Sequence, residues 1–455
     1  MLDRRVQLRL EAIRRLMRKG AVANLRRIVE KTHPADLAAI FQELNDLEQG
    51  RLFQILIQCE LAGDVLSELS PETLQQLLES LTDDEVAHIL GTMDSDDAAD
   101  VLSLLPEDRR GGILAAMNLE DSEEVGTLLK YPEDSAGGIM TPSFFALGEG
   151  ATVHEAVEAI QDAGEAETVF YVYVVDDEGR LVGVASLRRL ITSPRTSTLR
   201  QIMDSDVIRV HVLTDQEQVA RLVAKYDLLA IPVVDDDNRL VGIITVDDVI
   251  DVLREEATED VFKMAGTSQE ELVYGNRVVP IARIRMPWLV INLFGGILTG
   301  TILWWFRATV EEIIALVSFV PVITAMGGNV GTQSSSILVR GFATGRVDFE
   351  HLPAHLWKEV RVGLLLGLLC GALVGLAALI WHRNGYLGIV VAVSMVAAMT
   401  VAATMGTLAP AFFRKLKIDP AVASGPFVTT ANDITGILIY LGTATLFLRF
   451  LPHVR

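Results

Sequence analysis

The chain has 455 residues, of which 50% are hydrophobic and 22% are charged, and its mean hydropathy is +0.35. This length suffices for about three domains. Four stretches contain no Asp, Glu, Lys or Arg, and each is at least as long as the roughly 20 residues that cross a bilayer core: 287–306, 313–339, 362–381 and 384–413. These features exclude a wholly soluble enzyme and a disordered chain.

The charge is divided unevenly along the chain. Of the net −21, residues 274–455 contribute +7 from 7 acidic and 14 basic residues, which leaves −28 for residues 1–273. An acidic soluble part repels nucleic acid and anionic lipid and attracts metal cations; a merely solubilising surface is the alternative. The two cysteines, Cys59 and Cys370, lie in different parts and predict neither a disulfide framework nor a zinc site. The N-terminal residues lack a signal-peptide core, so we expect the acidic part in the cytosol.

Residues 1–130 are predicted to be helical throughout. Leu and Ile recur at spacings of three and four residues, which is typical of amphipathic helices. Pro71 and Pro106 are predicted to stand at the first position of a helix. The helices are short, about 12–20 residues by this pattern, and their succession predicts a stack resembling an α-solenoid.

Residues 138–256 contain an internal repeat. Residues 174–183 read VVDDEGRLVG and residues 233–242 read VVDDDNRLVG, so eight of ten positions are identical at an offset of 59. Each copy has a β-branched run, an acidic turn and a second strand, and a helix is predicted upstream, over 153–163 and 216–226. This arrangement resembles a tandem pair of CBS domains, which we place at residues 131–199 and 200–252.

The CBS resemblance implies a possible nucleotide site. In that family a hydroxyl residue and an Asp three positions later contact ribose and phosphate, and Thr245 and Asp248 match this pattern. Simple helix capping by Thr245 is the alternative. The first copy has Ser186 but carries Arg189 in place of the Asp, which puts nucleotide binding there in doubt.

The remainder is predicted to be a connecting helix followed by a membrane domain. Residues 253–280 begin as a charged helix that Gly266 ends, and residues 281–455 hold five predicted spans, about 287–307, 312–339, 358–382, 386–413 and 425–449. With the N-terminus in the cytosol, ten basic residues flank the spans inside and four outside, which satisfies the positive-inside rule and leaves the C-terminus outside.

Two polar motifs interrupt the apolar spans. Residues 327–334 read GGNVGTQS, which favours either tight helix packing or a water-lined path. Asp433 lies in the last span, where a carboxylate costs about 2.5–3.5 kcal/mol on insertion scales unless it lines a cavity or finds a partner. We interpret Asp433 as a cation site; a protonated or hydrogen-bonded structural Asp is the alternative.

The two motifs, GGNVGTQ and DPAVASGPFVTTANDITG, and the domain order resemble the MgtE family of magnesium channels and transporters. The resemblance covers essentially the whole chain. It implies a multidomain α-helical membrane protein with an α-solenoid-like N-domain, an α/β tandem CBS pair, a connecting plug helix and five transmembrane helices.

The resemblance also implies a homodimer with a Mg²⁺ pore on its two-fold axis, in the cytoplasmic membrane. The pore residues carried over by motif are Asp433, Asn329, Gly328, Thr332, Gly425, Thr429 and Gly436. A hydrated Mg²⁺ suits a pore of carboxylate and carbonyl oxygens, since Mg²⁺ gives up water reluctantly. Selectivity over Ca²⁺ rests on the resemblance alone.

In the family, cytosolic Mg²⁺ bridges carboxylates of the N-domain, the CBS pair and the plug helix and closes the pore. The corresponding candidates are Asp97, Asp100, Glu217, Asp227, Asp247, Asp248, Asp251, Glu256, Glu259, Asp260 and Asp419. Asp248 thus has two assignments. The MgtE resemblance makes it a metal ligand, and the CBS resemblance makes it a possible ATP contact together with Ser186, Arg189 and Thr245. For each acid a solvated surface is the alternative.

Three other functions compete with this interpretation. A proton-coupled divalent cation transporter, in which Asp433 takes up a proton, is the main alternative. An enzyme lacks support, because the sequence has no phosphate-binding loop with lysine and no HExxH motif. A CBS-gated anion channel conflicts with an acidic residue and no basic one at membrane depth.

Overall fold

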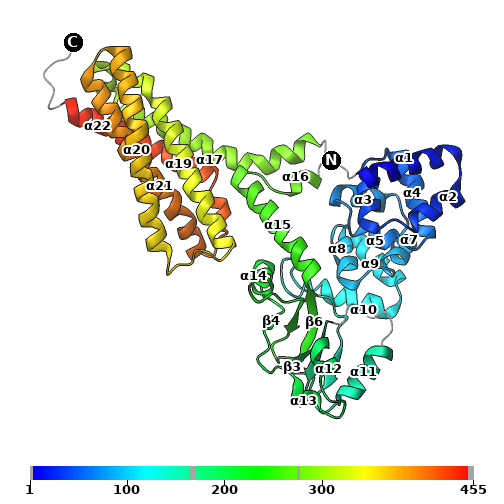
Figure 1. The fold of residues 1–455 in the computed structure, drawn as a ribbon. Helices are drawn as coiled ribbons and strands as arrows, with labels where there is room; N and C mark the ends of the chain where they lie inside the picture. Colours follow the sequence, from blue (N-terminus) through cyan, green and yellow to red (C-terminus); the bar gives the residue numbers. More distant parts are fainter. Residues whose placement is uncertain (1–3, 163–169, 274–276, 449–455) are drawn as a thin grey trace. The chain divides into compact units, whose positions relative to one another are not determined.

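The computed structural model describes residues 4–162, 170–273 and 277–448 (Figure 1). The chain divides into two compact units, residues 1–253 and 254–455, each with its own packing. The first unit contains the helical N-terminal region and the internal repeat, and the second contains the long apolar helices.

The N-terminal region is a stack of short helices. They are α1 (Arg4–Lys19), α2 (Val22–Val29), α3 (Pro34–Gln42), α4 (Asp46–Gln58), α5 (Ala62–Leu66), α6 (Pro71–Glu79), α7 (Asp83–Leu90), α8 (Ser95–Ser103), α9 (Glu107–Ala116) and α10 (Leu119–Leu128). Helix α1 packs against α3, α3 against α5, α5 against α7, α7 against α9, and α8 against α10. Packing against the helix two positions further on is the solenoid-like arrangement that the sequence predicted.

Local signals in the sequence set the helix boundaries. Asn45 and Thr82 each form a capping box with a glutamate three residues later. Pro71 occupies the first turn of α6, as predicted. The prediction for Pro106 was wrong by one position, because α9 begins at Glu107 and Pro106 is the residue that precedes it.

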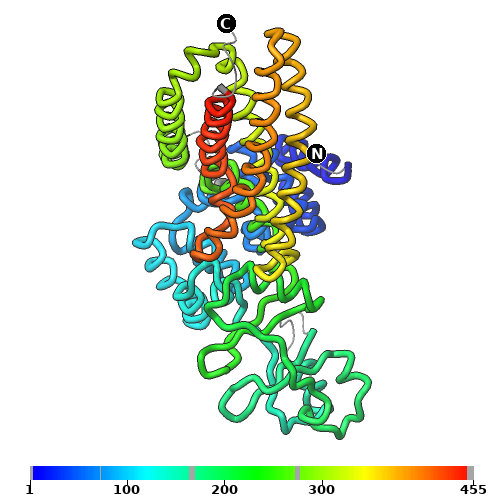
Figure 2. Tube along the Cα trace, turned by 90° about the vertical axis from the view of Figure 1, so that its left-hand side faces the viewer, coloured from blue at the N-terminus to red at the C-terminus, as the bar shows by residue number. Residues whose placement is uncertain are grey.

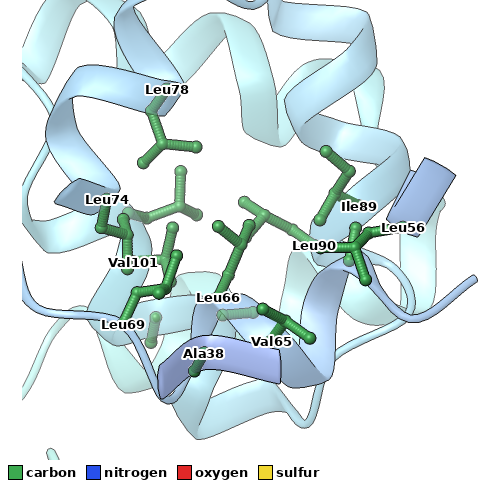
Figure 3. Close-up of a cluster of buried hydrophobic side chains, with 14 of the residues drawn as sticks. Ala38, Leu56, Val65, Leu66, Leu69, Leu74, Leu78, Ile89, Leu90 and Val101 are labelled. Carbon is green, nitrogen blue, oxygen red and sulfur yellow. The ribbon is translucent and has the colours of Figure 1, made fainter. Parts of the chain in front are cut away.

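A continuous apolar core holds the stack together. Figure 3 shows side chains from successive helices converging, among them Leu56, Leu66, Leu78 and Leu90, which are at most 1% exposed. Burying one such side chain contributes about 1.5–3 kcal/mol. Short helices that are marginal in isolation are therefore stable here through their contacts.

The internal repeat folds as two matching modules. The first has β1 (Ala146–Gly148), α11 (Val153–Asp162), β2 (Tyr171–Val175), β3 (Leu181–Ser186), α12 (Leu187–Thr192) and α13 (Leu199–Ile202). The second has β4 (Val210–His211), α14 (Gln216–Tyr226), β5 (Ala230–Val234), β6 (Leu240–Thr245) and α15 (Val246–Ala265). Residue 163, the last of the upstream helix predicted in the first copy, lies outside the described residues.

Each module contains a three-stranded sheet, in the order β1-β2-β3 or β4-β5-β6, with one parallel and one antiparallel pairing. The main strands of the two copies keep the offset of 59 found in the sequence, since β2 and β3 correspond to β5 and β6 residue for residue.

The two modules exchange a short segment. Thr141, which precedes β1 of the first module, pairs with Ile243 of the second, whereas Asp204, which precedes β4 of the second, pairs with Val184 of the first. Cβ atoms added at Gly242 or Gly183 would overlap the side chains of Met140 or Met203, respectively. The two glycines thus admit the methionines that precede each module, and the exchange ties the copies together.

The second unit is built from long apolar helices. After α16 (Glu270–Val273) come α17 (Val278–Trp305), α18 (Arg307–Glu312), the 3₁₀ helix η1 (Ile314–Phe319), α19 (Val320–Ala343), α20 (Leu352–His382), α21 (Gly385–Lys415), the 3₁₀ helix η2 (Pro420–Ala423) and α22 (Pro426–Leu448). In the described part, four helical stretches are long and apolar enough to cross a membrane: 278–305, 314–343, 352–382 and 385–415. The predicted fifth span coincides with α22, which is not among these four, so the five-span count stays a prediction.

Helices α20 and α21 run side by side (Figure 2). Glycines at positions 363, 367, 371 and 375 of α20 form a stripe with a four-residue period. A Cβ added at Gly371 would lie 2.7 Å from the Ala392 carbonyl oxygen, and one added at Gly375 would lie 2.7 Å from that of Gly388. The missing side chains let the two backbones approach closely, a common way of packing helices in a membrane.

Candidate ion pathway and regulatory surface

The polar motif of the second predicted span is continuous helix in α19. One face of this helix is buried, including Gly327, Gly328, Gly331 and Ser334. Asn329 is exposed on another face, followed one turn later by the exposed Gln333, while Thr332 is half-buried. The buried glycines therefore fit tight helix packing, while the exposed Asn329 and Gln333 are compatible with a water-lined path, which stays a prediction.

Helix α22 brings the second motif against the first. A Cβ added at Gly328 would lie 3.5 Å from the Thr429 methyl group, and one added at Gly436 would lie 3.9 Å from Ile323. Gly331 has no room for a side chain, because Asn432 of α22 lies against it. Residues about a hundred positions apart in the sequence are thus packed together along the α19–α22 contact.

Of the predicted pore residues of this last span, Thr429 and Gly436 lie at this contact. Thr429 is exposed and Asp433, one turn later, is half-buried. Gly425 lies at the start of the helix, where its backbone abuts the Met264 carbonyl group of α15 and leaves no room for a Cβ. Asn432 is 1% exposed, and neither of its side-chain polar atoms has a hydrogen-bond partner among the described residues.

Asp419 has a cationic partner from the end of α15. Lys263 Nζ donates to Asp419 Oδ2 at 2.6 Å and lies 2.6 Å from Glu259 Oε1, while Asp419 Oδ1 accepts from the backbone of Ala421 at 2.8 Å. Burial lowers the pKa of Lys263, but hydrogen bonds and charges of Asp419 and Glu259 outweigh it and raise the pKa above its ordinary value. The family resemblance implies a shared metal ion here, which stays a prediction; the structure brings an ammonium group to both carboxylates.

A cluster of acids forms where the start of α8 faces the start of α15, within the first unit. Burial raises the pKa of Asp96 to about 7, with Asp248 and Asp97 adding to the shift. Burial likewise raises the pKa of Asp97 to about 7, with contributions from Asp100, Asp94 and Asp248. The pKa of Asp248 is also raised, chiefly by burial. Carboxylates crowded in this way repel one another unless protons or cations neutralise them.

The other predicted regulatory acids have varied surroundings. Glu217 pairs with Arg221 one turn later on α14. Asp227 ends that helix in a left-handed conformation with φ 51°. Asp247 accepts a hydrogen bond from the Thr245 hydroxyl, Glu259 pairs with Lys263, and the remaining candidates Asp251, Glu256 and Asp260 lie on α15. No group of three or more His, Cys, Asp or Glu with metal-binding geometry occurs among the described residues.

The two residues of the predicted nucleotide motif, Thr245 and Asp248, are hydrogen-bonded to each other. Thr245 Oγ1 donates to Asp248 Oδ2 at 2.6 Å, and the Thr245 backbone N–H donates to the same oxygen at 3.2 Å. At the corresponding position of the first module, Ser186 accepts from the backbone N–H of Arg189 at 3.3 Å and caps α12. Ser186 therefore caps its helix, whereas the Thr245 hydroxyl and backbone N–H both donate to the Asp248 side chain.

Sequence reasoning missed three acids. Asp94 and Asp96 lie beside the predicted Asp97, and only the fold shows that they share its surface. Glu359, in α20, is 3% exposed and accepts a hydrogen bond from Ser334 Oγ of α19 at 2.8 Å. The signal that could have identified it is that Glu359 is the one acid within the predicted span 358–382.

Comparison with known proteins gives consistent results along the chain. Residues 32–134 match the MgtE intracellular N domain, residues 136–195 and 199–255 match the CBS domain, and residues 320–443 match the MgtE divalent cation transporter family. The magnesium transporter MgtE of Bacillus subtilis is 39% identical over 339 residues, 74% of this chain and 75% of that protein. The protein of the same name from Thermus thermophilus is 44% identical over 329 residues, 71% of this chain and 72% of that protein.

Two solved structures resemble the soluble part. The soluble part of a magnesium transporter has a TM-score of 0.51 at 32% identity and covers 55% of this chain and 99% of that one. The cytosolic domain of the Mg²⁺ channel MgtE in complex with ATP has a TM-score of 0.51 at 40% identity and covers 53% of this chain and 99% of that one. The extent and identity of these matches, together with the order of the domains, show that the chain belongs to the MgtE family of magnesium transporters, which transport an ion and are not enzymes.

Proposed function

We propose that this protein is a Mg²⁺-selective channel of the cytoplasmic membrane, which takes up Mg²⁺ down its electrochemical gradient and is closed by cytosolic Mg²⁺. The observation that carries the proposal is the packing of α19 on α22. It places Gly328 against Thr429 and leaves Asn329 exposed, with Asp433 one turn further along α22.

Exposed polar side chains on an apolar helix bundle are unfavourable against lipid, so they should face water or a second protein surface. Asn329, Thr332, Thr429 and Asp433 offer oxygen atoms, the ligands that Mg²⁺ prefers. In a homodimer these residues would occur twice around a two-fold axis, together with Gly425 and Gly436 of the same motif. Paired carboxylates and neutral oxygens suit a hydrated divalent ion that must bind and leave again.

Closure by Mg²⁺ is supported by the acidic cluster at the start of α8 and α15. The pKa values of these carboxyl groups are raised chiefly by burial and further by their mutual repulsion, and a divalent cation would offset both costs of ionising them. We propose that Asp97, Asp100, Asp247, Asp248 and Asp251 provide ligands there. The further regulatory candidates are Glu217, Asp227, Glu256, Glu259, Asp260 and Asp419.

We further propose that the second CBS module binds ATP. The support is the relative solved in complex with ATP, at 40% identity over the soluble part. Thr245 and Asp248 would contact the nucleotide, whereas Ser186 and Arg189 would give the first module at most a weaker site.

The test is Mg²⁺ flux into proteoliposomes that contain the purified protein. Asp433→Ala and Asp433→Asn should both reduce flux at least tenfold while the protein remains monodisperse, because the carboxylate charge and not its size is required. Flux should follow the Mg²⁺ gradient and stay unchanged when a proton gradient is imposed. Wild-type flux in the Asn variant refutes the pore assignment, and flux driven by a proton gradient favours the proton-coupled transporter.

A further inference from the structure

Helix α17 makes a polar contact with the proposed pore helix α22. Thr430 Oγ1 of α22 donates a hydrogen bond to Asn292 Oδ1 of α17 at 2.9 Å. One turn later on α17, Gly295 is buried, and a Cβ added there would overlap the Thr430 side chain. Asn292 and Gly295 therefore both contact the Thr430 side chain: Asn292 accepts a hydrogen bond from its hydroxyl group, and Gly295 leaves space for its methyl group.

The contact lies on the opposite side of Asp433 from α19. At about 100° per residue, Thr429, Gly436 and Asn432 lie about 40°, 60° and 100° to one side of Asp433, and Thr430 lies about 60° to the other. The first three residues pack against α19, at Gly328, Ile323 and Gly331 respectively. Asp433 thus projects between the surface of α22 that α19 holds and the surface that α17 holds.

The residue types suit such a role. Elsewhere α17 is mostly apolar and exposed, with Gly295 and Ile302 as its buried residues. A polar amide in an apolar span is unfavourable unless it is hydrogen-bonded, and interhelical hydrogen bonds together with small residues are the usual means of fixing one membrane helix on another. Rotation of α22 toward α19 would break the Asn292–Thr430 bond, so this bond resists such rotation.

We propose that Asn292, Gly295 and Thr430 form a clamp that fixes the rotation of α22 and so orients Asp433 toward the ion. They are positioning residues, since Asp433 and not the clamp meets the ion. The inference rests on the proposed function, because it assumes that Asp433 lines the pore.

The experiment measures Mg²⁺ flux of the full-length protein in proteoliposomes as a function of external Mg²⁺. Thr430→Val keeps the shape of the side chain but removes the donor, and Thr430→Ser keeps the donor. Thr430→Val should raise the half-saturating Mg²⁺ concentration about threefold, the size expected for one interhelical hydrogen bond, whereas Thr430→Ser should stay near the wild type. Asn292→Ala should match Thr430→Val, and the double variant should be no worse than either alone.

Thr301→Val is the matched control. The Thr301 hydroxyl group also lies on α17 but donates to the Ile297 carbonyl group of its own helix at 2.9 Å, so its loss should leave the half-saturating concentration unchanged. Gly295→Ala should weaken apparent affinity further than Thr430→Val, because its methyl group displaces Thr430.

The outcomes separate this inference from the proposed function. If Asp433→Asn abolishes flux while Thr430→Val behaves like Thr301→Val, the clamp is refuted and the pore assignment stands. Multiplying effects in the Asn292→Ala, Thr430→Val double variant also refute the clamp, since the two side chains then act separately. Wild-type flux in Asp433→Asn refutes both.

Discussion

At the scale of single residues, Thr245 and Asp248 are already hydrogen-bonded to each other, so ATP binding would have to break these bonds. The Thr245 hydroxyl and backbone N–H both donate to Asp248 Oδ2. A nucleotide would exchange these bonds for bonds to its ribose and phosphate, so the net gain per contact is about 1 kcal/mol.

We therefore expect Thr245→Ala and Asp248→Ala each to weaken ATP binding about fivefold, which corresponds to that energy. Isothermal titration calorimetry of the full-length protein in detergent should give one ATP per chain, because Arg189 replaces the acid in the first module. Ser186→Ala is the control and should leave the affinity unchanged. Two equivalent sites, or equal affinity in the Thr245 and Ser186 variants, would contradict this assignment.

At the scale of elements, the end of α15 meets the start of the last predicted span. Gly266, with φ 75°, ends α15, and a Cβ added to it would lie 2.9 Å from Pro426 at the start of α22. Lys263 forms ion pairs with Asp419 and Glu259 at the same place. In this arrangement the ammonium group of Lys263 joins the end of α15 to the start of the last predicted span.

We predict that Lys263→Met weakens closure, while Lys263→Arg preserves it. The two half-exposed ion pairs contribute about 1 kcal/mol together, so the Mg²⁺ concentration for half-closure should rise about fivefold in the Met variant. Because its partners raise the pKa of Lys263 above the ordinary value of 10.5, the side chain stays an ammonium group throughout pH 6 to 8, and the contact should not change over that range. Flux at stepped internal Mg²⁺ measures the midpoint; unchanged closure in Lys263→Met would mean that the ion pairs do not hold α15.

At the scale of the whole molecule, the sequence predicted the features that local patterns and internal repetition encode. These include the short helices of the N-terminal region, the two modules with their offset of 59 and the polar motifs within apolar helices. It could not predict contacts between distant segments. Three such contacts depend on how elements pack and leave no trace in the local sequence pattern. They are the exchange of Met140 and Met203 between modules, the Lys263–Asp419 pair and the Glu359–Ser334 bond.

The acidic cluster of the first unit makes the molecule sensitive to pH in a defined direction. Asp96 and Asp97 have ordinary pKa values of 3.8 and values of about 7 in the fold. The folded contact between α8 and α15 therefore binds more protons than the separated segments do, and its stability falls as pH rises from about 4 to about 7. Mg²⁺ should reverse this loss, because it replaces the protons as counter-charge.

We thus predict that, with Mg²⁺ removed by EDTA, the full-length protein exchanges backbone hydrogens at α8 and at the start of α15 faster at pH 8 than at pH 6, after correction for intrinsic exchange rates. Saturating Mg²⁺ should remove the difference.

In the Asp97→Asn, Asp248→Asn variant the pH effect should shrink, since two of the interacting charges are gone, and the Mg²⁺ response should weaken with it. A pH effect that persists unchanged in that variant would place the titrating groups elsewhere. If that variant loses the pH effect but keeps full Mg²⁺ protection, other carboxylates bind the ion. Several sites are expected to act together, since switching a two-state element from 1:99 to 99:1 takes about 5.5 kcal/mol of differential binding, more than one exposed site is expected to supply.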